Sequence, residues 1–192
     1  MFLAARCPGC SSFGPAPCAA CVASMAPARD VPVPEALDGC RALLVYDGAA
    51  REVVAQLKYR GARSVIAWLA GGLAQLVDAD EVDVLTWAPT TAARRRRRGF
   101  DQAELLARAV SRACGVACAA TLVRAPGPAQ TGRSLADRRT GPIFGPTVAL
   151  GGLRMVLVDD VVTTGATLAA AGRALRAAGA GGVVGLAAAH PP

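Results

Sequence analysis

The chain has 192 residues, of which 53% are hydrophobic and 4% aromatic, and its formal net charge is +7. This length accommodates one full-sized domain with a sizeable core and a small additional module. No apolar run approaches the ~18 residues that a membrane-spanning helix needs, which argues against membrane insertion. The positive charge indicates an anionic partner, a requirement that phosphates on a small molecule satisfy as well as nucleic acid does.

The first elements in the chain are four cysteines in two closely spaced pairs. Residues 7–21 read CPGCSSFGPAPCAAC, so Cys7, Cys10, Cys18 and Cys21 form a C-x2-C-x7-C-x2-C pattern. Each C-x-x-C turn lets two thiolates reach one ion at ~2.3 Å, and a structural Zn²⁺ takes four such ligands. The metal then replaces a hydrophobic core that a segment of ~25 residues cannot build.

Disulfides and a redox-active pair are the alternatives for these cysteines. The apolar run at the N-terminus is shorter than the ~7–15-residue core of a signal peptide, so we expect a cytoplasmic protein, whose thiols stay reduced. Two adjacent C-x-x-C pairs also favour shared ligation over redox chemistry. We therefore expect a zinc-ribbon-like module in residues 1–30, and we interpret Cys40, Cys114 and Cys118 as small buried residues.

A proline-rich stretch, APARDVPVPEALDG, follows this module and predicts a linker up to about residue 38, before a main domain over residues 39–192. Strand and helix signals then alternate along the main domain. Strands are predicted at 41–45, 81–89, 116–125, 153–158 and 182–189, and helices at 49–61, 63–77, 102–114 and 167–179. This alternation predicts an α/β fold with a parallel sheet flanked by helices.

The helix over 102–114 has the clearest boundaries. Asp101 followed by Glu104 fits a capping box, and Gly115 ends the helix. A polar loop rich in glycine and proline, PGPAQTGRSLADRRTGPIFGP, is expected after the strand at 116–125.

Two adjacent acids, Asp159 and Asp160, end an otherwise apolar strand and are followed by a turn of small and hydroxyl-bearing residues. Ligands of open parallel sheets bind beyond the carboxyl ends of the strands, where both acids can turn toward one ligand. Gly165 lets backbone N–H groups approach an oxyanion, and the following helix adds the positive end of its dipole. The pattern predicts a phosphate beside a sugar diol, bound by Asp159, Asp160, Val161, Val162, Thr163, Thr164, Gly165, Ala166 and Thr167.

The stretch VLVDDVVTTGAT resembles the phosphoribosyl pyrophosphate (PRPP) motif of type I phosphoribosyltransferases at every position. The blocks YDGAAREVVAQLKYRG, WAPTTAARRRRRGFDQAELLA and AQTGRSLADRRTGPIF resemble those of the competence protein ComF family, which joins a cysteine zinc module to a phosphoribosyltransferase-like domain. Asp101 stands where the family is expected to have Asn, and either residue caps a helix.

The ComF resemblance implies further ligand contacts from basic residues. In the loop after the strand at 81–89, Arg98 and Arg94 are expected at the pyrophosphate, because guanidinium groups bind phosphates bidentately. The rest of the arginine run is interpreted as a solvated basic face. Lys58 either reaches a phosphate or snorkels from its helix. Gln130, Arg133 and Arg138 lie on the polar loop, which either covers the ligand as a hood or is a plain surface loop.

Two functional hypotheses follow from these features. The first is a ComF-like phosphoribosyltransferase-type protein that binds Mg²⁺ and PRPP, with Asp159 and Asp160 as catalytic residues, and that is connected to DNA uptake and natural transformation. The second is a non-catalytic competence factor that senses PRPP or associates with single-stranded DNA and a competence helicase. No acceptor is identified, because Ala166, Leu168 and Ala169 occupy the positions where purine transferases carry another acid.

Overall fold

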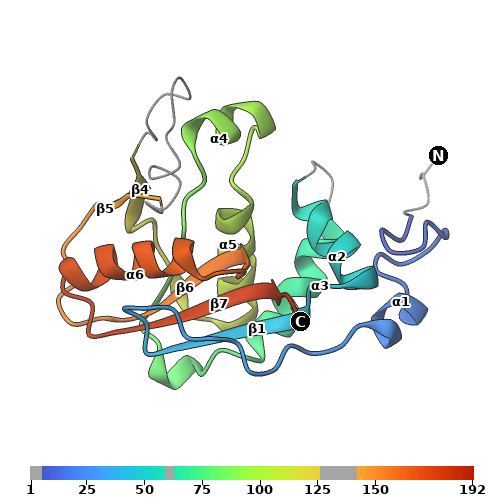
Figure 1. Cartoon of the computed structure of the whole chain (residues 1–192), viewed down its shortest axis with the longest axis horizontal. Coiled ribbons are helices and arrows are strands. Elements are labelled where there is room, and N and C mark those ends of the chain that lie inside the picture. Colours follow the sequence, from blue (N-terminus) through green and yellow to red (C-terminus); the bar gives the residue numbers. More distant parts are fainter. Residues whose placement is uncertain (1–5, 59–62, 126–141) are drawn as a thin grey trace.

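A computed structural model describes residues 6–58, 63–125 and 142–192. Its centre is a five-stranded sheet in the order β1-β7-β6-β2-β3, in which every neighbouring pair is parallel. The strands are β1 (Gly39–Val45), β2 (Val84–Trp87), β3 (Ala117–Cys118), β6 (Arg154–Val161) and β7 (Gly182–His190). The predicted α/β fold with a parallel sheet is confirmed (Figure 1).

Helices cover both faces of this sheet and give it two hydrophobic cores. On one face lie α2 (Gly48–Ala55), η1 (Gln56–Lys58), α3 (Arg63–Ala74) and α5 (Gln102–Cys114). The other face is covered by α6 (Ala166–Ala177). The helical spacing predicted from the sequence is explained by burial, since Leu69, Leu73, Leu106 and Leu175 all have 0% exposure. A strand between two such layers must be apolar on both sides, as β6 is up to Val158.

The helix predicted over 102–114 is confirmed at both ends. The Asp101 side chain accepts hydrogen bonds from the N–H groups of Ala103 and Glu104, and Gly115 ends the helix with a φ of 79°. The Glu104 carboxylate pairs with Arg108 and Arg95. Local capping chemistry therefore determines where α5 begins and ends.

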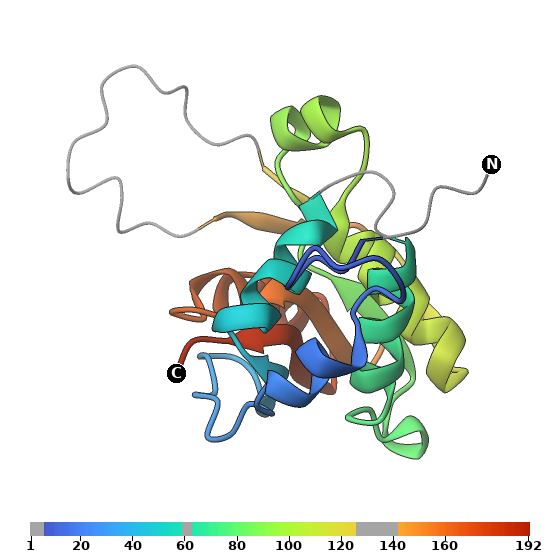
Figure 2. The same cartoon turned by 90° about the vertical axis from the view of Figure 1, so that its right-hand side faces the viewer.

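Three local predictions were wrong. Residues 116–125 form two short strands, β3 and β4 (Leu122–Arg124), because the chain leaves the main sheet at Ala119 and Ala120. The end of the predicted loop is β5 (Phe144–Pro146), which pairs with β4 in an antiparallel two-stranded sheet. The arginine run lies in a helix, α4 (Ala92–Arg98), with Thr91 at its N-cap and Gly99 at its C-cap, and this helix stands away from the main sheet (Figure 2).

The N-terminal part contains one short helix, α1 (Ala19–Ser24), and lies beside α2 (Figure 1). After α1, the chain runs antiparallel to the edge strand β1, where the Val45 N–H donates to the Ala26 carbonyl at 2.9 Å and the Ala28 N–H donates to the Leu43 carbonyl at 3.1 Å. Residues 34–38 then cross toward α6. The proline-rich segment is thus packed on the main domain along much of its length.

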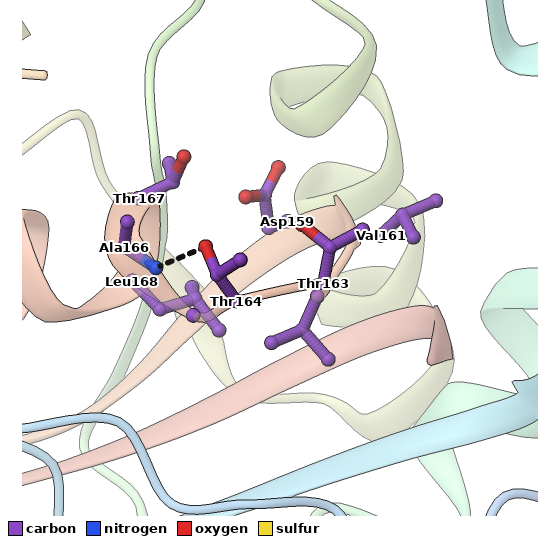
Figure 3. A pocket seen from close by; sticks show the side chains of 9 residues that line it. Asp159, Val161, Thr163, Thr164, Ala166, Thr167 and Leu168 are labelled. Atoms are coloured by element: carbon purple, nitrogen blue, oxygen red, sulfur yellow. Dashed lines mark hydrogen bonds between the residues drawn. The ribbon is translucent and has the colours of Figure 1, made fainter. Parts of the chain in front are cut away.

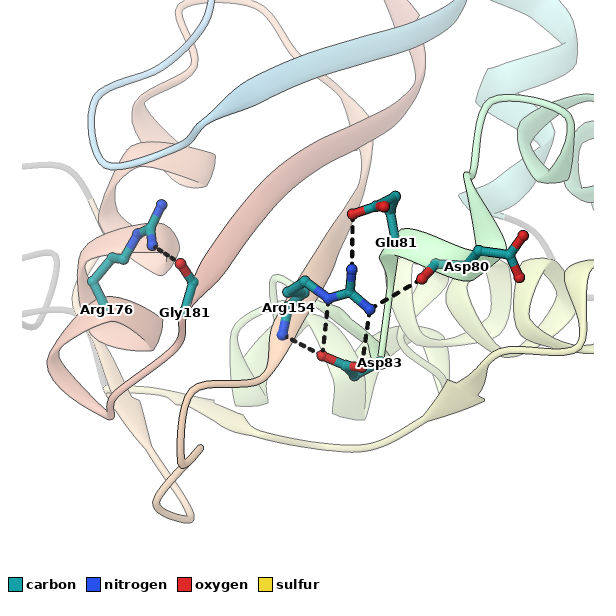
Figure 4. Close-up of polar contacts among 6 residues, drawn as sticks. All are labelled: Asp80, Glu81, Asp83, Arg154, Arg176 and Gly181. Atoms are coloured by element: carbon teal, nitrogen blue, oxygen red, sulfur yellow. Dashed lines mark hydrogen bonds and ion pairs between the residues drawn. The ribbon is translucent and has the colours of Figure 1, made fainter.

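Ion pairs and hydrogen bonds close the amino end of the sheet (Figure 4). Arg154, the first residue of β6, binds Glu81 at 2.7 Å, Asp83 at 3.4 Å and the Asp80 carbonyl at 3.0 Å, so it joins β6 to η2 (Ala79–Glu81). The Arg154 backbone N–H, followed by its guanidinium, lowers the pKa of Asp83. Because side chains of the protein satisfy one another here, the carboxyl end is the better candidate for ligand binding.

Within the described residues, no helix is both long and apolar enough to cross a membrane.

Candidate functional site

A pocket lies at the carboxyl end of β6, where the strand turns into α6 (Figure 3). Its empty volume is about 200 Å³, and its lining residues are Asp159, Val161, Val162, Thr163, Thr164, Gly165, Ala166, Thr167 and Leu168. This volume includes space that is open to solvent, so the pocket fits one part of a ligand and does not enclose a whole one. The structure brings together all the residues predicted at this turn except Asp160 as the lining of one pocket.

The backbone of the turn is arranged for an anion. Gly165 has a φ of 72°, a left-handed conformation that glycine adopts without steric cost, and it precedes the 12-residue helix α6. The Thr164 hydroxyl accepts a hydrogen bond from the Ala166 N–H at 3.4 Å, while the Thr163 and Thr164 side chains are exposed. The first N–H groups of α6 and two hydroxyls thus face one small region, which also receives the positive end of the helix dipole.

The two acids have different surroundings. Asp159 lines the pocket, and its carboxylate accepts a hydrogen bond from the Asp160 N–H at 2.8 Å. Loss of solvent, and then the negative charge of Asp160, raise the pKa of Asp159 well above its usual range. Asp160 accepts a hydrogen bond from the Gln102 amide at 3.2 Å. One acid therefore faces the turn, and the other is held by α5.

Gln102 also connects the acids to the arginine helix. Arg98 donates a hydrogen bond to the Gln102 side-chain oxygen at 2.6 Å, and the Gln102 amide donates to Asp160. Arg98 is half-buried, whereas Arg94, Arg96 and Arg97 are exposed. Of the five arginines, Arg98 is thus the one linked through hydrogen bonds to the acid pair. The sequence did not reveal the role of Gln102, which lies 58 residues before Asp160.

Asp101 fixes the start of α5 against the loop after β2. Its side chain is buried, with 3% exposure, and accepts hydrogen bonds from the Thr90 N–H at 2.7 Å and from the Ala103 N–H at 3.0 Å. Burial raises the pKa of Asp101, and these N–H donors oppose that shift. Asp101 is therefore a buried anchor that determines the position of the neighbouring Gln102.

Arg124, at the end of β4, is a second residue that the sequence did not single out. Its guanidinium lies over the Phe144 ring, 5.5 Å from the ring centroid. Partial burial, followed by the positive charge of Arg94, lowers the pKa of Arg124, whereas Asp159 and Asp101 raise it. The charges of Asp159 and of Arg94 on α4 therefore both act on Arg124. Its place at the end of a short apolar segment, TLVRA, gives no local indication of this.

None of the predicted basic residues Arg94, Arg98 and Lys58 lines the pocket. Lys58 is exposed at the end of η1 and does not contribute to the pocket lining described above. Gln130, Arg133 and Arg138 lie outside the described residues. His190, for which we predicted no role, ends β7, and its Nδ1 lies 2.9 Å from the Val162 carbonyl.

The four N-terminal cysteines form a second candidate site. The sulfur atoms of Cys7, Cys10, Cys18 and Cys21 all lie within 4.8 Å of one another, and those of Cys10 and Cys18 are 3.6 Å apart. A tetrahedral ion with bonds of ~2.3 Å would hold its sulfurs about 3.8 Å apart, so the four cysteines fit a zinc module.

None of the four thiols of this module is in a disulfide, and two of their pKa values shift in opposite directions: the hydrogen bond with Cys7 is the main reason why the pKa of Cys21 is raised to about 12. The backbone N–H of Cys18 donates to Cys7 Sγ at 3.4 Å, and this contact is the main reason why the pKa of Cys7 is lowered to about 6. Thiolates are the form that binds a metal. The remaining cysteines, Cys40, Cys114 and Cys118, are half-buried rather than fully buried as predicted.

The chain is 29% identical over 140 residues to the competence protein ComFC of Bacillus subtilis (strain 168), an alignment that covers 70% of this chain and 57% of ComFC. The chain resembles the ComF family. The match to ComFC spans little more than half of its length, and no protein-family model matches the chain.

Two solved structures are also similar to this ComF-like chain. One is described as the allosteric regulatory enzyme of purine biosynthesis, with 23% identity, a TM-score of 0.49, and coverage of 70% of this chain and 30% of that one. The other is the glutamine PRPP amidotransferase from B. subtilis with ADP and GMP, with 23% identity, a TM-score of 0.47, and coverage of 69% and 30%.

Proposed function

We propose that this chain is a ComF-like protein of the phosphoribosyltransferase type that binds Mg–PRPP at the carboxyl end of β6. The observation that carries the proposal is the pocket in which an acid, a left-handed glycine and two exposed threonines surround the start of α6. Backbone N–H groups at a helix start bind phosphate, and ionised carboxylates accept hydrogen bonds from sugar hydroxyls. The similarity to ComFC supports the connection to competence and DNA uptake.

Each part of the turn has a separate task in this proposal. The N–H groups from Thr163 to Thr167 and the threonine hydroxyls hold the 5-phosphate of PRPP, whereas the Val161 and Val162 N–H groups donate to the Asp160 carboxylate and to the Ala189 carbonyl. Asp159 and Asp160 accept hydrogen bonds from the two ribose hydroxyls and orient the ring. Because Asp160 is also held by Gln102, the carboxylate nearer α5 has a defined position before the ligand arrives.

The pyrophosphate group is assigned to the basic side chains beside the acids. Arg98, Arg124 and Arg94 are the candidates, because Gln102 links Arg98 to Asp160, and the charges of both Asp159 and Arg94 act on Arg124. Lys58 is a further proposed phosphate contact, reached from the end of η1. In transfer, an acceptor forms a bond to C1 of the ribose while the C1–oxygen bond to pyrophosphate breaks. The arginines then stabilise the charge that develops on the departing pyrophosphate.

When bound with the substrate, Mg²⁺ would neutralise part of the pyrophosphate charge. The carboxylates of Asp159 and Asp160 would hold the ribose hydroxyls of such a ligand, and the guanidinium groups of Arg98 and Arg124 would hold its anionic leaving group. We assign a structural Zn²⁺ to Cys7, Cys10, Cys18 and Cys21, in a module over residues 1–30. We place the ligand site in a domain over residues 39–192. We also propose that the protein is cytoplasmic.

Calorimetric titration with PRPP and Mg²⁺ tests this proposal. The unmodified protein should bind, and the double variant Asp159→Asn/Asp160→Asn should lose binding. The double variant Asp78→Asn/Asp80→Asn is the matched control, because it removes the same two charges at exposed positions near the amino end of the sheet. Absence of binding by the unmodified protein, or equal loss in both variants, would contradict the proposal.

A competence factor that associates with single-stranded DNA is the second candidate. The observation that favours it is the exposure of Arg94, Arg96 and Arg97 on α4, which projects from the molecule (Figure 2). Phosphate contacts of this kind weaken steeply as salt rises. Binding of an oligonucleotide should therefore fall with salt and with Arg96→Ala/Arg97→Ala. Binding that ignores both changes would count against this role and against a link to a competence helicase.

A further inference from the structure

Residues 34–38, the end of the proline-rich segment, reach the turn between β6 and α6. The closest contact joins Pro34 and Gly165. A Cβ atom placed on Gly165 would lie 2.7 Å from Pro34 Cγ and 3.1 Å from Pro34 Cβ. The proline ring therefore fills the space directly behind the one residue of the turn that has a left-handed backbone, with a φ of 72°.

The rest of the segment is anchored on the same helix and on the sheet. Leu37 packs against Gly172 of α6 and Gly185 of β7, where side chains are absent and the leucine can approach the backbone. Asp38 joins the edge of β7, because its N–H donates to the Val183 carbonyl at 2.8 Å and its carboxylate accepts from the Val183 N–H at 2.8 Å. The segment is thus held at its C-terminal end independently of Pro34.

Ion pairs connect the segment to the outer face of α6. Arg173 binds Glu35 at 3.0 Å, and Arg176 binds Asp38 and the Ala36 carbonyl. Upstream, residues 26–28 pair with β1 and lead back to the cysteine module. The chain between the cysteines and the main domain is therefore fixed on both sides of Pro34.

We propose that residues 34–38 form a strap that positions the Gly165 turn, with Pro34 as the positioning residue. Glycine has access to a wider range of backbone angles than any other residue, and Thr163 and Thr164 beside it are exposed, so the turn needs an external support to keep one conformation. Pro34 provides this support at the place where a side chain on Gly165 would stand. The contribution of the strap to phosphate binding rests on the proposed function, whereas its support of the Gly165 turn does not.

If Pro34 only fills space between the segment and the turn, a different result is expected when it is replaced. If Pro34 only buried apolar surface, its removal would lower the melting temperature and raise hydrogen exchange generally. If Pro34 positions the turn, exchange rises at the amides around Gly165 while the rest of the sheet keeps its protection.

Hydrogen exchange followed by mass spectrometry on the full chain distinguishes these roles without any ligand. Pro34→Ala should speed exchange in the peptide over residues 162–169 by about tenfold, because one ordered turn is released. Pro32→Ala is the matched control, since Pro32 is exposed in the same segment and loses the same ring. Pro34→Val, which restores apolar bulk against Gly165, should recover much of the protection.

The ligand arm then separates the strap from the proposed function. Mg–PRPP should bind Pro34→Ala about tenfold more weakly than it binds Pro32→Ala, in line with the faster exchange. Faster exchange at the turn without PRPP binding by any form would overturn the proposed function and support the strap. Exchange at the turn that is equal in Pro34→Ala and Pro32→Ala would overturn the strap, whatever the affinity for PRPP.

Discussion

Replacing Asp101 with alanine removes a buried anchor on which the arrangement of the site depends. The side chain has 3% exposure, and its two oxygens accept hydrogen bonds from the N–H groups of Thr90, Ala103 and Glu104. Thr90 leads into α4, and the other two begin α5. A single carboxylate therefore joins the arginine helix to the helix that carries Gln102.

The expected loss of stability follows from these three contacts. Losing an N-cap costs about 1–2 kcal/mol. Leaving the Thr90 N–H without an acceptor costs about 1–3 kcal/mol. Because burial raises the pKa of Asp101, removing its charge returns part of this cost. We expect Asp101→Ala to lower the free energy of unfolding by about 3 kcal/mol, which lowers the melting temperature by about 6–12 °C in a chain of this size.

Thermal unfolding followed by circular dichroism measures this loss. Asp47→Ala is the control, because Asp47 is also an N-cap but is exposed and, among the described residues, accepts a hydrogen bond from the Gly48 N–H only. Asp101→Asn should lie between Asp101→Ala and the unmodified protein, since one oxygen remains for the N–H groups of α5. A melting temperature of Asp101→Ala equal to that of Asp47→Ala would refute the anchoring role.

Three further predictions concern the metal and the ligand. Cys21→Ser should reduce zinc, measured by elemental analysis, from one per chain to well below one, while Cys114→Ser retains it; equal contents would contradict the assignment. Because the pKa of Asp159 is raised and the ionised form accepts the ribose hydroxyls, Mg–PRPP affinity should rise with pH through that pKa and binding should release a proton; calorimetric enthalpies that do not depend on the buffer would refute this. Gln102→Ala should weaken Mg–PRPP binding about tenfold or more, since bonds to charged groups contribute ~1.5–3 kcal/mol, whereas the exposed Gln75→Ala should not; equal dissociation constants would count against the positioning role.

Elements with strong local signals could be predicted from the sequence. The helix over 102–114 was predicted at its observed limits because Asp101 and Gly115 act on neighbouring residues. The turn after Asp160 was likewise predictable, since acids, threonines and Gly165 are adjacent in the chain. Local chemistry determined both, and the pocket lies where this pattern indicated.

Features that depend on distant contacts could not be predicted. The segment 116–125 has a continuous strand-like pattern, but only the position of β5 shows that its second half belongs to another sheet. Gln102 reaches Asp160 across 58 residues, and Pro34 lies against Gly165 across a still longer separation in sequence. Such pairings form only when strands and helices assemble, so the sequence around one residue does not indicate its distant partner.

The central claim is that the turn between β6 and α6 holds a phosphate while the preceding acids hold the sugar. Nuclear magnetic resonance of the ¹⁵N-labelled protein during addition of Mg–PRPP measures this residue by residue. We expect the largest shifts at the backbone amides of residues 161–168, and none of this size when Asp159 and Asp160 are both replaced by asparagine. Shifts that centre on another part of the chain, with the amides of this turn unchanged, would contradict it.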